Sequence, residues 1–276
     1  MEKRDQKEHI SMQAKQNIIE LTDIQLSFGD RQIFNNLSIQ IPTGKITAIL
    51  GPSGSGKTTL LKMLSGQMTP NAGQVELMGH DLGSISTKNL YEIRTKMGVL
   101  FQSGALFTDM TVYDNVAFAL REHTDLNDSM IDTLVLLKLQ SVGLRALKDS
   151  YPSQLSGGQA RRVALARAIA LDPALLLYDE PFTGQDPISM GVLIRLIKNL
   201  NDALKITSVV ISHDVEEVLS ISDNVCVLGE KKIIAQGTPD DIRNHPNPWV
   251  KQFINGDADG PVPFHIPTKP LEEVLF

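Results

Sequence analysis

The sequence predicts an α/β fold with a mainly parallel sheet, and three features carry this prediction. Short apolar runs alternate with longer helical patterns, as in 175–178, 188–204 and 208–211, and this order is typical of parallel sheets covered by helices. The apolar run 45–50 leads into a glycine-rich loop and then a helix. From 111 to 171 the pattern is mainly helical, so we expect a helical insertion in the α/β core.

The composition of the 276-residue chain narrows its class. Hydrophobic residues make up 42% and charged residues 21%, which is enough for a packed core and excludes a wholly disordered chain. The net charge of -6 argues against a surface that binds nucleic acid or anionic membrane by charge. The single cysteine, Cys226, excludes a disulfide framework and is expected to be a core thiol. With no apolar run near the roughly 18 residues of a membrane span and no apolar leader, we expect a cytoplasmic globular protein.

The chain begins with charged residues and continues with strands. Residues 1–16 carry charges of both signs and little to bury, so we expect a flexible N-terminal arm. Two partly alternating segments, 18–28 and 32–41, flank Gly29-Asp30 and predict antiparallel strands joined by a tight turn. The apolar run 45–50 predicts a short buried strand.

Helices and strands then follow in alternation. A helix is expected at 58–64, and Gly66 ends it. Further strands are expected at 75–78 and 97–101, and helices at 111–120, 128–139 and 157–171. Apolar residues recur every four positions from Ile188 to Leu204, which predicts an amphipathic helix.

The composition changes after residue 255. Residues 256–276 contain four prolines and end in Val274-Leu275-Phe276, so we expect an extended C-terminal tail. A disordered end gains nothing from exposed apolar residues. Our hypothesis is therefore that this tail wraps a neighbouring subunit or a small partner; the alternative is a solubilising end.

The glycine-rich loop fits G-x-x-x-x-G-K-[ST] at every fixed position. Backbone N–H groups of such a loop surround phosphate oxygens, and the following helix directs its positive end at the same anion. The lysine adds a charge for the phosphates, and the hydroxyl after it is a Mg²⁺ ligand. The alternative is a turn that merely starts a helix. The candidate nucleotide-binding residues are Gly51, Pro52, Ser53, Gly54, Ser55, Gly56, Lys57, Thr58 and Thr59.

Two adjacent carboxylates end the apolar run 175–178. Asp179 is placed to hold the metal, and Glu180 to orient and polarise an attacking water. The alternative is a solvated turn before Pro181. A phosphate-binding loop alone leaves kinases, GTPases and motor ATPases open, and the two carboxylates narrow this choice.

A third motif narrows the choice. Leu155-Ser156-Gly157-Gly158-Gln159 opens a helix 23 positions before Asp179 and is followed by Arg161-Arg162. It resembles the signature of ATP-binding cassette (ABC) ATPases. Gln102 resembles the Q-loop glutamine of that family, Thr183 to Asp186 resemble its D-loop, and His213 resembles its switch histidine. The resemblance covers about 18–254.

This resemblance implies the ABC ATPase fold, a P-loop NTPase (RecA-like) core with an antiparallel β subdomain and an inserted helical subdomain. The domain would occupy 17–255, with the helical subdomain at about 103–171. It also implies ATP and Mg²⁺ as cofactors and a head-to-tail dimer, in which each ATP lies between one P-loop and the signature of the second copy.

The resemblance also assigns roles to residues. The catalytic residues would be Glu180, His213 and Gln102, and the Mg²⁺ ligands Thr58, Gln102 and Asp179. Nucleotide contacts beyond the P-loop would come from Phe28, Ser156, Gly157, Gly158, Gln159 and Asp186. For Phe28, an adenine platform and a buried core position are both open. The sequence departs from the family at Ala160 and at Gly184-Gln185, so the contacts of the D-loop across the dimer are in doubt.

Three local segments show a narrower resemblance. Residues 102–109, 115–124 and 179–191 resemble the ATPase subunits of the Mla phospholipid-transport systems. This resemblance implies a place at the cytoplasmic face of a bacterial inner membrane, in a complex that moves phospholipid between inner and outer membranes. The implied partners are a MlaE-type permease, a MlaD-type periplasmic lipid-binding protein and a MlaB-type STAS protein, with no nucleic acid.

Other readings stay open. They are the ATPase subunit of another importer, a soluble ABC ATPase acting on nucleic acid or ribosomes, and a P-loop small-molecule kinase. Within the transporter reading, we expect residues 103–109 and the helices after them to form the groove for a permease helix. Leu106 and Phe107 are apolar residues of this segment; the alternative is that they pack inside the helical block.

Overall fold

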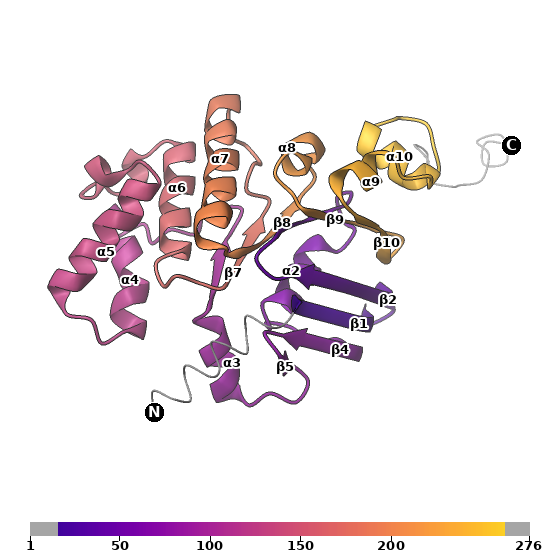
Figure 1. Cartoon of the computed structure of the whole chain (residues 1–276), viewed down its shortest axis with the longest axis horizontal. Helices are drawn as coiled ribbons and strands as arrows, with labels where there is room; N and C mark the ends of the chain where they lie inside the picture. Colours follow the sequence, from indigo (N-terminus) through magenta and orange to yellow (C-terminus); the bar gives the residue numbers. More distant parts are fainter. Residues whose placement is uncertain (1–15, 263–276) are drawn as a thin grey trace, which may run out of the picture.

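Two sheets form the frame of the chain, whose computed structural model describes residues 16–262 (Figure 1). The first sheet is antiparallel, with strand order β2-β1-β4-β5. Its strands are β1 (Asn17–Phe28), β2 (Arg31–Pro42), β4 (Ala72–Leu77) and β5 (His80–Asp81). The expected hairpin about Gly29-Asp30 is present, with Phe28 paired to Arg31. The positive φ of Gly29 suits the residue without a side chain.

The second sheet has six strands in the order β10-β9-β3-β8-β7-β6. Its strands are β3 (Ile46–Leu50), β6 (Met97–Leu100), β7 (Leu175–Asp179), β8 (Thr207–Ser212), β9 (Asn224–Gly229) and β10 (Lys232–Gly237). Only β10 runs antiparallel to its neighbour. Every residue of β3 and β8 is buried, as expected when both faces of a parallel sheet are covered.

Helices flank this sheet. They are α2 (Lys57–Leu64), α3 (Thr87–Arg94), α7 (Pro187–Leu204), α8 (Val215–Leu219), α9 (Pro239–Arg243) and α10 (Pro248–Asn255). The amphipathic helix expected at 188–204 is α7. Asp186 caps its start, because its carboxylate accepts from the N–H groups of Ile188 and Ser189. No helix within residues 16–262 is long and apolar enough to cross a bilayer.

The expected helical block lies between β6 and β7 and stands beside the sheet (Figure 1). It consists of α4 (Val112–His123), α5 (Asp128–Ser141) and α6 (Gly157–Ala168), with short 3₁₀ turns at Arg145–Leu147 and Pro152–Gln154. Side chains of Thr111, Asn127 and Ser156 cap the three helices. The helix expected at 157–171 ends at Ala168, because the backbone already leaves the helical conformation at Ile169, with φ -99 and ψ 8.

The six-stranded sheet separates two apolar cores. Ile46, Ala48 and Leu50 of β3 point into one, which continues into the helical block, while Ile49 points into the other. Burying one such side chain stabilises the fold by roughly 1.5–3 kcal/mol. The prediction for Cys226 is confirmed, because it is fully buried in the second core and burial raises the pKa of its thiol to about 12.

The chain turns back after α10. Gly256 has φ +71, and the side-chain amide of Gln252 then bonds both the N–H and the carbonyl of Val262, at 2.8 and 3.0 Å. The first part of the predicted tail is therefore held against α10. The remainder, residues 263–276, lies outside the described residues, as does the predicted arm up to residue 15.

Candidate nucleotide-binding site

The candidate site lies at the carboxyl ends of the parallel strands. The loop 51–56 follows β3, Gln102 follows β6 after one residue, Glu180 follows β7, and His213 follows β8. Because these strands are parallel neighbours, their following residues meet at one edge of the sheet, where ligands of such folds bind. Residues far apart in sequence are thus brought together by the fold.

The loop after β3 needs glycine at two positions. A Cβ on Gly51 would lie 2.5 Å from the carbonyl oxygen of Leu228. Gly56 precedes α2 with φ +104, and a Cβ there would meet the ring of Phe34 at 2.9 Å. No side chain caps the start of α2, so the first N–H groups of this helix are free to bind an anion.

Lys57 is the first residue of α2 and only 8% exposed. Its Nζ donates to the carbonyls of Gly51 and Pro52, at 2.8 and 3.2 Å, and lies 3.5 Å from Glu180 Oε1. These oxygens surround the ammonium as phosphate oxygens would. The lysine is therefore a buried positive charge already aimed into the site.

A cavity of about 600 Å³ extends from this loop to the β1–β2 hairpin. It is lined by Phe28, Arg31, Ile33, Ser53, Gly54, Gly56, Lys57, Thr58, Thr59, Gln102, Glu180 and His213. The alternative of a core position for Phe28 is wrong, because its side chain lines this cavity and the residue is 50% exposed. An exposed ring beside a phosphate-binding loop offers a surface on which a base can stack.

Glu180 is held by several donors. Its backbone has φ +46, and its N–H bonds the carbonyl of Ile211 at 2.9 Å. Its carboxylate lies 2.8 Å from His213 Nδ1 and accepts from Ser212 Oγ at 3.3 Å. With its side chain 13% exposed, Glu180 does not form the solvated turn considered as an alternative. A carboxylate so oriented can accept a proton from water or polarise it.

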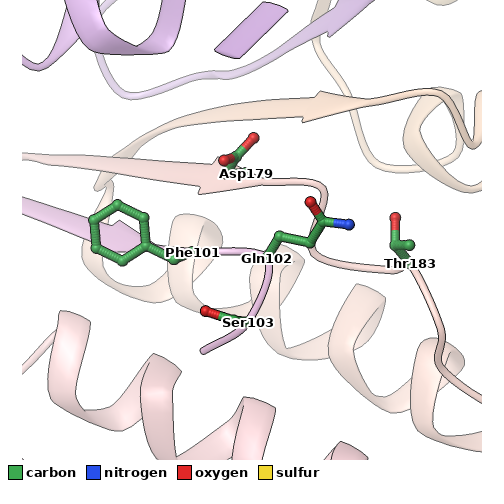
Figure 2. Close-up of a pocket in the computed structure, with 5 residues that line it drawn as sticks. All are labelled: Phe101, Gln102, Ser103, Asp179 and Thr183. Atoms are coloured by element: carbon green, nitrogen blue, oxygen red, sulfur yellow. The ribbon is translucent and has the colours of Figure 1, made fainter. Parts of the chain in front are cut away.

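Asp179 lies at the end of β7 and lines a second cavity of about 520 Å³ (Figure 2). Burial raises the pKa of Asp179 above its ordinary value, and repulsion from Glu180 raises it further, while Lys57 offsets part of the effect. Figure 2 shows the Gln102 side chain extending toward Asp179 and Thr183. Gln102 lines both cavities, so it connects the carboxylate with the phosphate-binding loop.

The residues present fit a Mg²⁺ site. The donors are the Asp179 carboxylate, the Gln102 amide oxygen and the Thr58 hydroxyl, and all line one or both cavities. Mg²⁺ prefers such oxygen ligands, and a cation would favour the ionised form of a carboxylate whose pKa burial has raised. Atoms of Glu180, His213 and Asp214 also lie within 4.8 Å of one another, but Glu180 and His213 already bond each other there.

The signature residues lie elsewhere in the same chain. Ser156 Oγ accepts from the N–H of Gln159 at 3.2 Å, and Gln159 Oε1 accepts from the N–H of Ser156 at 2.8 Å. Gly158 is packed on Ser189, whose Oγ would lie 2.5 Å from an added Cβ, whereas Gly157 has open space. Of the residues assigned to ATP, Ser156, Gly157, Gly158, Gln159 and Asp186 line neither of these two cavities.

Sequence reasoning missed several residues of the site, and three of them, Phe101, Ser103 and Thr183, line the second cavity. Arg31 and Ile33 line the larger cavity, and Ser212 donates to Glu180. Arg31 stands opposite Phe28 in the hairpin, and Ser212 directly precedes His213. The pairing of Phe28 across the expected turn was the available signal for Arg31, whereas nothing in the sequence indicated Ser212.

Known proteins resemble this chain in both sequence and fold. The family model described as "ABC transporter" matches residues 34–183. The "Intermembrane phospholipid transport system ATP-binding protein MlaF" of Haemophilus influenzae is 54% identical over 261 residues, which are 95% of this chain and 99% of the relative.

Two solved structures share the fold. One is cbiO1 from Clostridium perfringens, part of the ABC transporter complex cbiONQ, with a TM-score of 0.78 and 29% identity over 84% of this chain and 92% of that one. The other is the ATP-binding cassette MJ0796, described as a dimer in a post-hydrolysis state bound to ADP and Pi. Its TM-score is 0.73 and its identity 27%, over 80% of this chain and 98% of that one.

Proposed function

The chain belongs to the ABC transporter family of ATPases, and from this premise we propose that it drives phospholipid transport between the inner and outer membranes of a bacterium. It hydrolyses ATP as the energy source of a transporter. The 54% identity to an intermembrane phospholipid transport ATPase, over nearly all of both chains, supports phospholipid as the cargo. The alternative is the ATPase subunit of another importer.

In the proposed mechanism, the P-loop and α2 bind the phosphates of ATP. Lys57 exchanges its contacts with Gly51, Pro52 and Glu180 for phosphate oxygens, which frees the Glu180 carboxylate. Thr58, Gln102 and Asp179 would hold Mg²⁺, which would supply positive charge to neutralise the phosphates. The Phe28 ring stacks on the adenine.

Glu180 then orients and polarises the attacking water. The 2.8 Å contact between its Oε2 and His213 Nδ1 fixes the carboxylate and leaves His213 Nε2 to contact the γ-phosphate. This Glu180–His213 pair beside Lys57 is the observation that carries the mechanism, because it places a base, a polar orienting group and a phosphate-binding cation in one cavity.

We place the second half of each site on a second copy of the chain. One chain has one P-loop and one signature, and its signature residues line neither of the cavities described above. The open space at Gly157, at the start of α6, suits the γ-phosphate of a facing chain. The dimeric form of the solved MJ0796 cassette supports this arrangement.

A permease partner would bind the loop between β6 and α4. Phe107 and Phe118 are each 38% exposed, with ring centroids 4.9 Å apart, and Arg167 lies over the Phe107 ring. Leu106 instead packs partly against the core. We propose that a cytoplasmic helix of a MlaE-type permease covers the two rings. MlaD-type and MlaB-type proteins would join the complex, which holds the chain at the inner membrane.

The cargo is tested by purifying the membrane complex through a tag on this chain and identifying its bound lipid. Reconstituted between donor and acceptor vesicles, the complex should move labelled phospholipid only with ATP and Mg²⁺. Glu180→Gln in the same complex is the matched control and should stop transfer. ATPase activity stimulated by an amino acid or nucleotide cargo, with no lipid transfer, would assign the chain to another importer.

A further inference from the structure

Helix α6 carries three arginines that donate to backbone carbonyls, and two of them, Arg161 and Arg167, bind the loops beside the second cavity. Arg161 is 8% exposed and Arg167 is partly buried, and neither has a carboxylate within ion-pair distance among residues 16–262. Burial lowers the pKa of both guanidinium groups. Burying a charged group that has no carboxylate partner costs free energy of desolvation. An apolar side chain would fill the same space without this cost, so the arginines need another explanation.

Arg161 joins two loops of the site. Its Nη1 donates to the carbonyl of Phe101 at 3.1 Å, and its Nη2 to the carbonyl of Thr183 at 3.3 Å. The first carbonyl belongs to the peptide that leads into Gln102. The second leads into Gly184, which has φ +74, within the loop from Glu180 to Asp186. One planar group therefore fixes the backbone on both sides of the second cavity.

We propose that Arg161 is a positioning residue that locks the Gln102 loop (residues 101–105) to the β7–α7 loop (residues 180–186) and makes both follow α6. Because Ser156 begins the same helix, a displacement of α6 would reach Gln102 and Asp186 together. The proposed function enters this inference only in naming ATP as the ligand of the site. The lock itself is a property of the separate chain.

Arg167 offers a matched comparison on the same helix. Its Nη1 and Nη2 donate to the carbonyls of Ala105 and Gly104, at 2.8 and 3.0 Å. It resembles Arg161 in its two carbonyl contacts, but of the two loops it bonds only the Gln102 loop, and its guanidinium also lies over the Phe107 ring. Losing Arg167 removes a restraint of the same kind without touching the β7–α7 loop.

The test is hydrogen exchange of the full chain, read by mass spectrometry, for wild type, Arg161→Lys, Arg161→Gln and Arg167→Gln. A lysine has a single ammonium and cannot reproduce the fork that meets two carbonyls. Both Arg161 variants should speed exchange in 101–105 and 180–186 together, by about tenfold, since each loop loses a charge-assisted bond. Arg167→Gln should speed exchange in 101–105 only.

Three results would overturn the lock. The first is faster exchange in only one of the two loops of the Arg161 variants. The second is an equal rise in exchange rate across α6 and both sheets. The third is faster exchange in both loops of Arg167→Gln. The first two outcomes would give Arg161 a local or purely structural role. Arg161→Lys keeps the charge, so it decides the question even where Arg161→Gln unfolds.

A second readout separates positioning from nucleotide binding. Arg161 lines neither cavity, so Arg161→Lys should keep the Kd for a fluorescent ATP analogue within about twofold while kcat falls about tenfold or more. An equal loss of affinity would contradict the proposal. If the complex transports another cargo, exchange and binding in this chain are unaffected, so failure of the proposed function is recognised separately.

Discussion

At the scale of single residues, Glu180 shows why the catalytic carboxylate could be found from sequence and its surroundings could not. Position and motif indicated Glu180 directly. Its left-handed backbone, its bond to His213 and its contact with Lys57 depend on β8 and α2 lying beside β7. Those contacts join residues that are far apart in sequence, so they come from the sheet order.

Glu180→Gln should retain ATP and Mg²⁺ binding but lower turnover by at least about 100-fold, because an amide cannot polarise water as a carboxylate does. Dimers closed on ATP should accumulate. Steady-state phosphate release and size-exclusion chromatography with ATP measure the two effects. Glu216→Gln, in an exposed ion pair with Arg243, is the control. Turnover equal to wild type in Glu180→Gln would move the catalytic role elsewhere.

Asp179 gives a stability prediction with a definite sign. Its pKa is raised in the folded chain, chiefly by burial. Between the ordinary and the raised pKa the folded chain binds more protons than the unfolded chain, so this group lowers stability as pH rises through that window. Above that window, burial of the ionised Asp179 therefore lowers the free energy of unfolding.

Asp179→Asn should raise Tm by a few degrees at neutral pH and abolish most Mg²⁺-dependent turnover, by at least about 100-fold. The gain in Tm should shrink as pH falls toward the ordinary carboxyl pKa. Thermal melts across pH measure it, with Asp202→Asn, in a surface pair with Lys198, as control. A variant less stable than wild type at neutral pH would show that contacts of the carboxylate outweigh its burial.

At the scale of elements, the second half of the loop between β6 and α4 is held by the buried side chain of Asn115. Asn115 donates to the carbonyls of Phe107, Met110 and Thr111 and accepts from the N–H of Phe107. These four hydrogen bonds fix the loop. Within it, Leu106 packs partly against the core and Phe107 is exposed. The sequence placed both residues in the expected docking segment but did not distinguish them.

The two positions should respond differently to a charge. Leu106→Asp should lower the free energy of unfolding by about 1–3 kcal/mol, because a carboxylate would enter an apolar contact. Phe107→Asp should leave Tm near wild type and uncouple ATP hydrolysis from transport. Urea denaturation and vesicle transfer measure the two effects. If Phe107→Asp transports normally, the exposed rings are not the permease contact.

Several of the elements that sequence reasoning missed are short and lie at the edge of the fold. β10 is a six-residue strand at the sheet edge with only Ala235 buried, and it forms because β9 offers a partner. α9 has five residues and is held by a capping box between Thr238 and Asp241. In contrast, β3, β7 and α7 follow from apolar runs and four-residue periodicity. The elements with a long apolar run or periodicity were therefore predictable, whereas β9, though buried inside the sheet, and the short edge elements were missed.

At the scale of the whole molecule, the expected α/β architecture with a helical insertion is confirmed. The order of strands in each sheet was not predictable, because it depends on which pairs bury the most surface. The signature motif could be recognised in the sequence. That its residues line neither cavity of the same chain could be seen only in the folded structure. Its role across a dimer remains a proposal.

The C-terminal tail is tested by truncation. A chain ending at residue 262 keeps the bonds between Gln252 and Val262, so its ATP affinity should equal that of the full chain. If residues 263–276 wrap a neighbour, recovery of the dimer or of partners in pull-downs should fall severalfold. Normal assembly and transport by the truncated chain would make the tail a solubilising end only.

The separation of the signature from the P-loop has a further test in two variants. Lys57→Ala should weaken nucleotide binding about tenfold or more, because a charge-assisted phosphate contact is lost. Ser156→Arg should leave binding to the separate chain near wild type and block closure. Since Ser156 also caps α6, Ser156→Ala measures the cap alone, about 1 kcal/mol. Equal loss of binding in both variants would count against the shared site.

In genetic terms, the two lesions should complement each other. A mixed dimer pairs the intact P-loop of the Ser156→Arg chain with the intact signature of the Lys57→Ala chain, and its other site carries both defects. Two preparations that are each inactive should therefore regain ATPase activity when mixed, and two such alleles expressed together should restore growth where either alone fails.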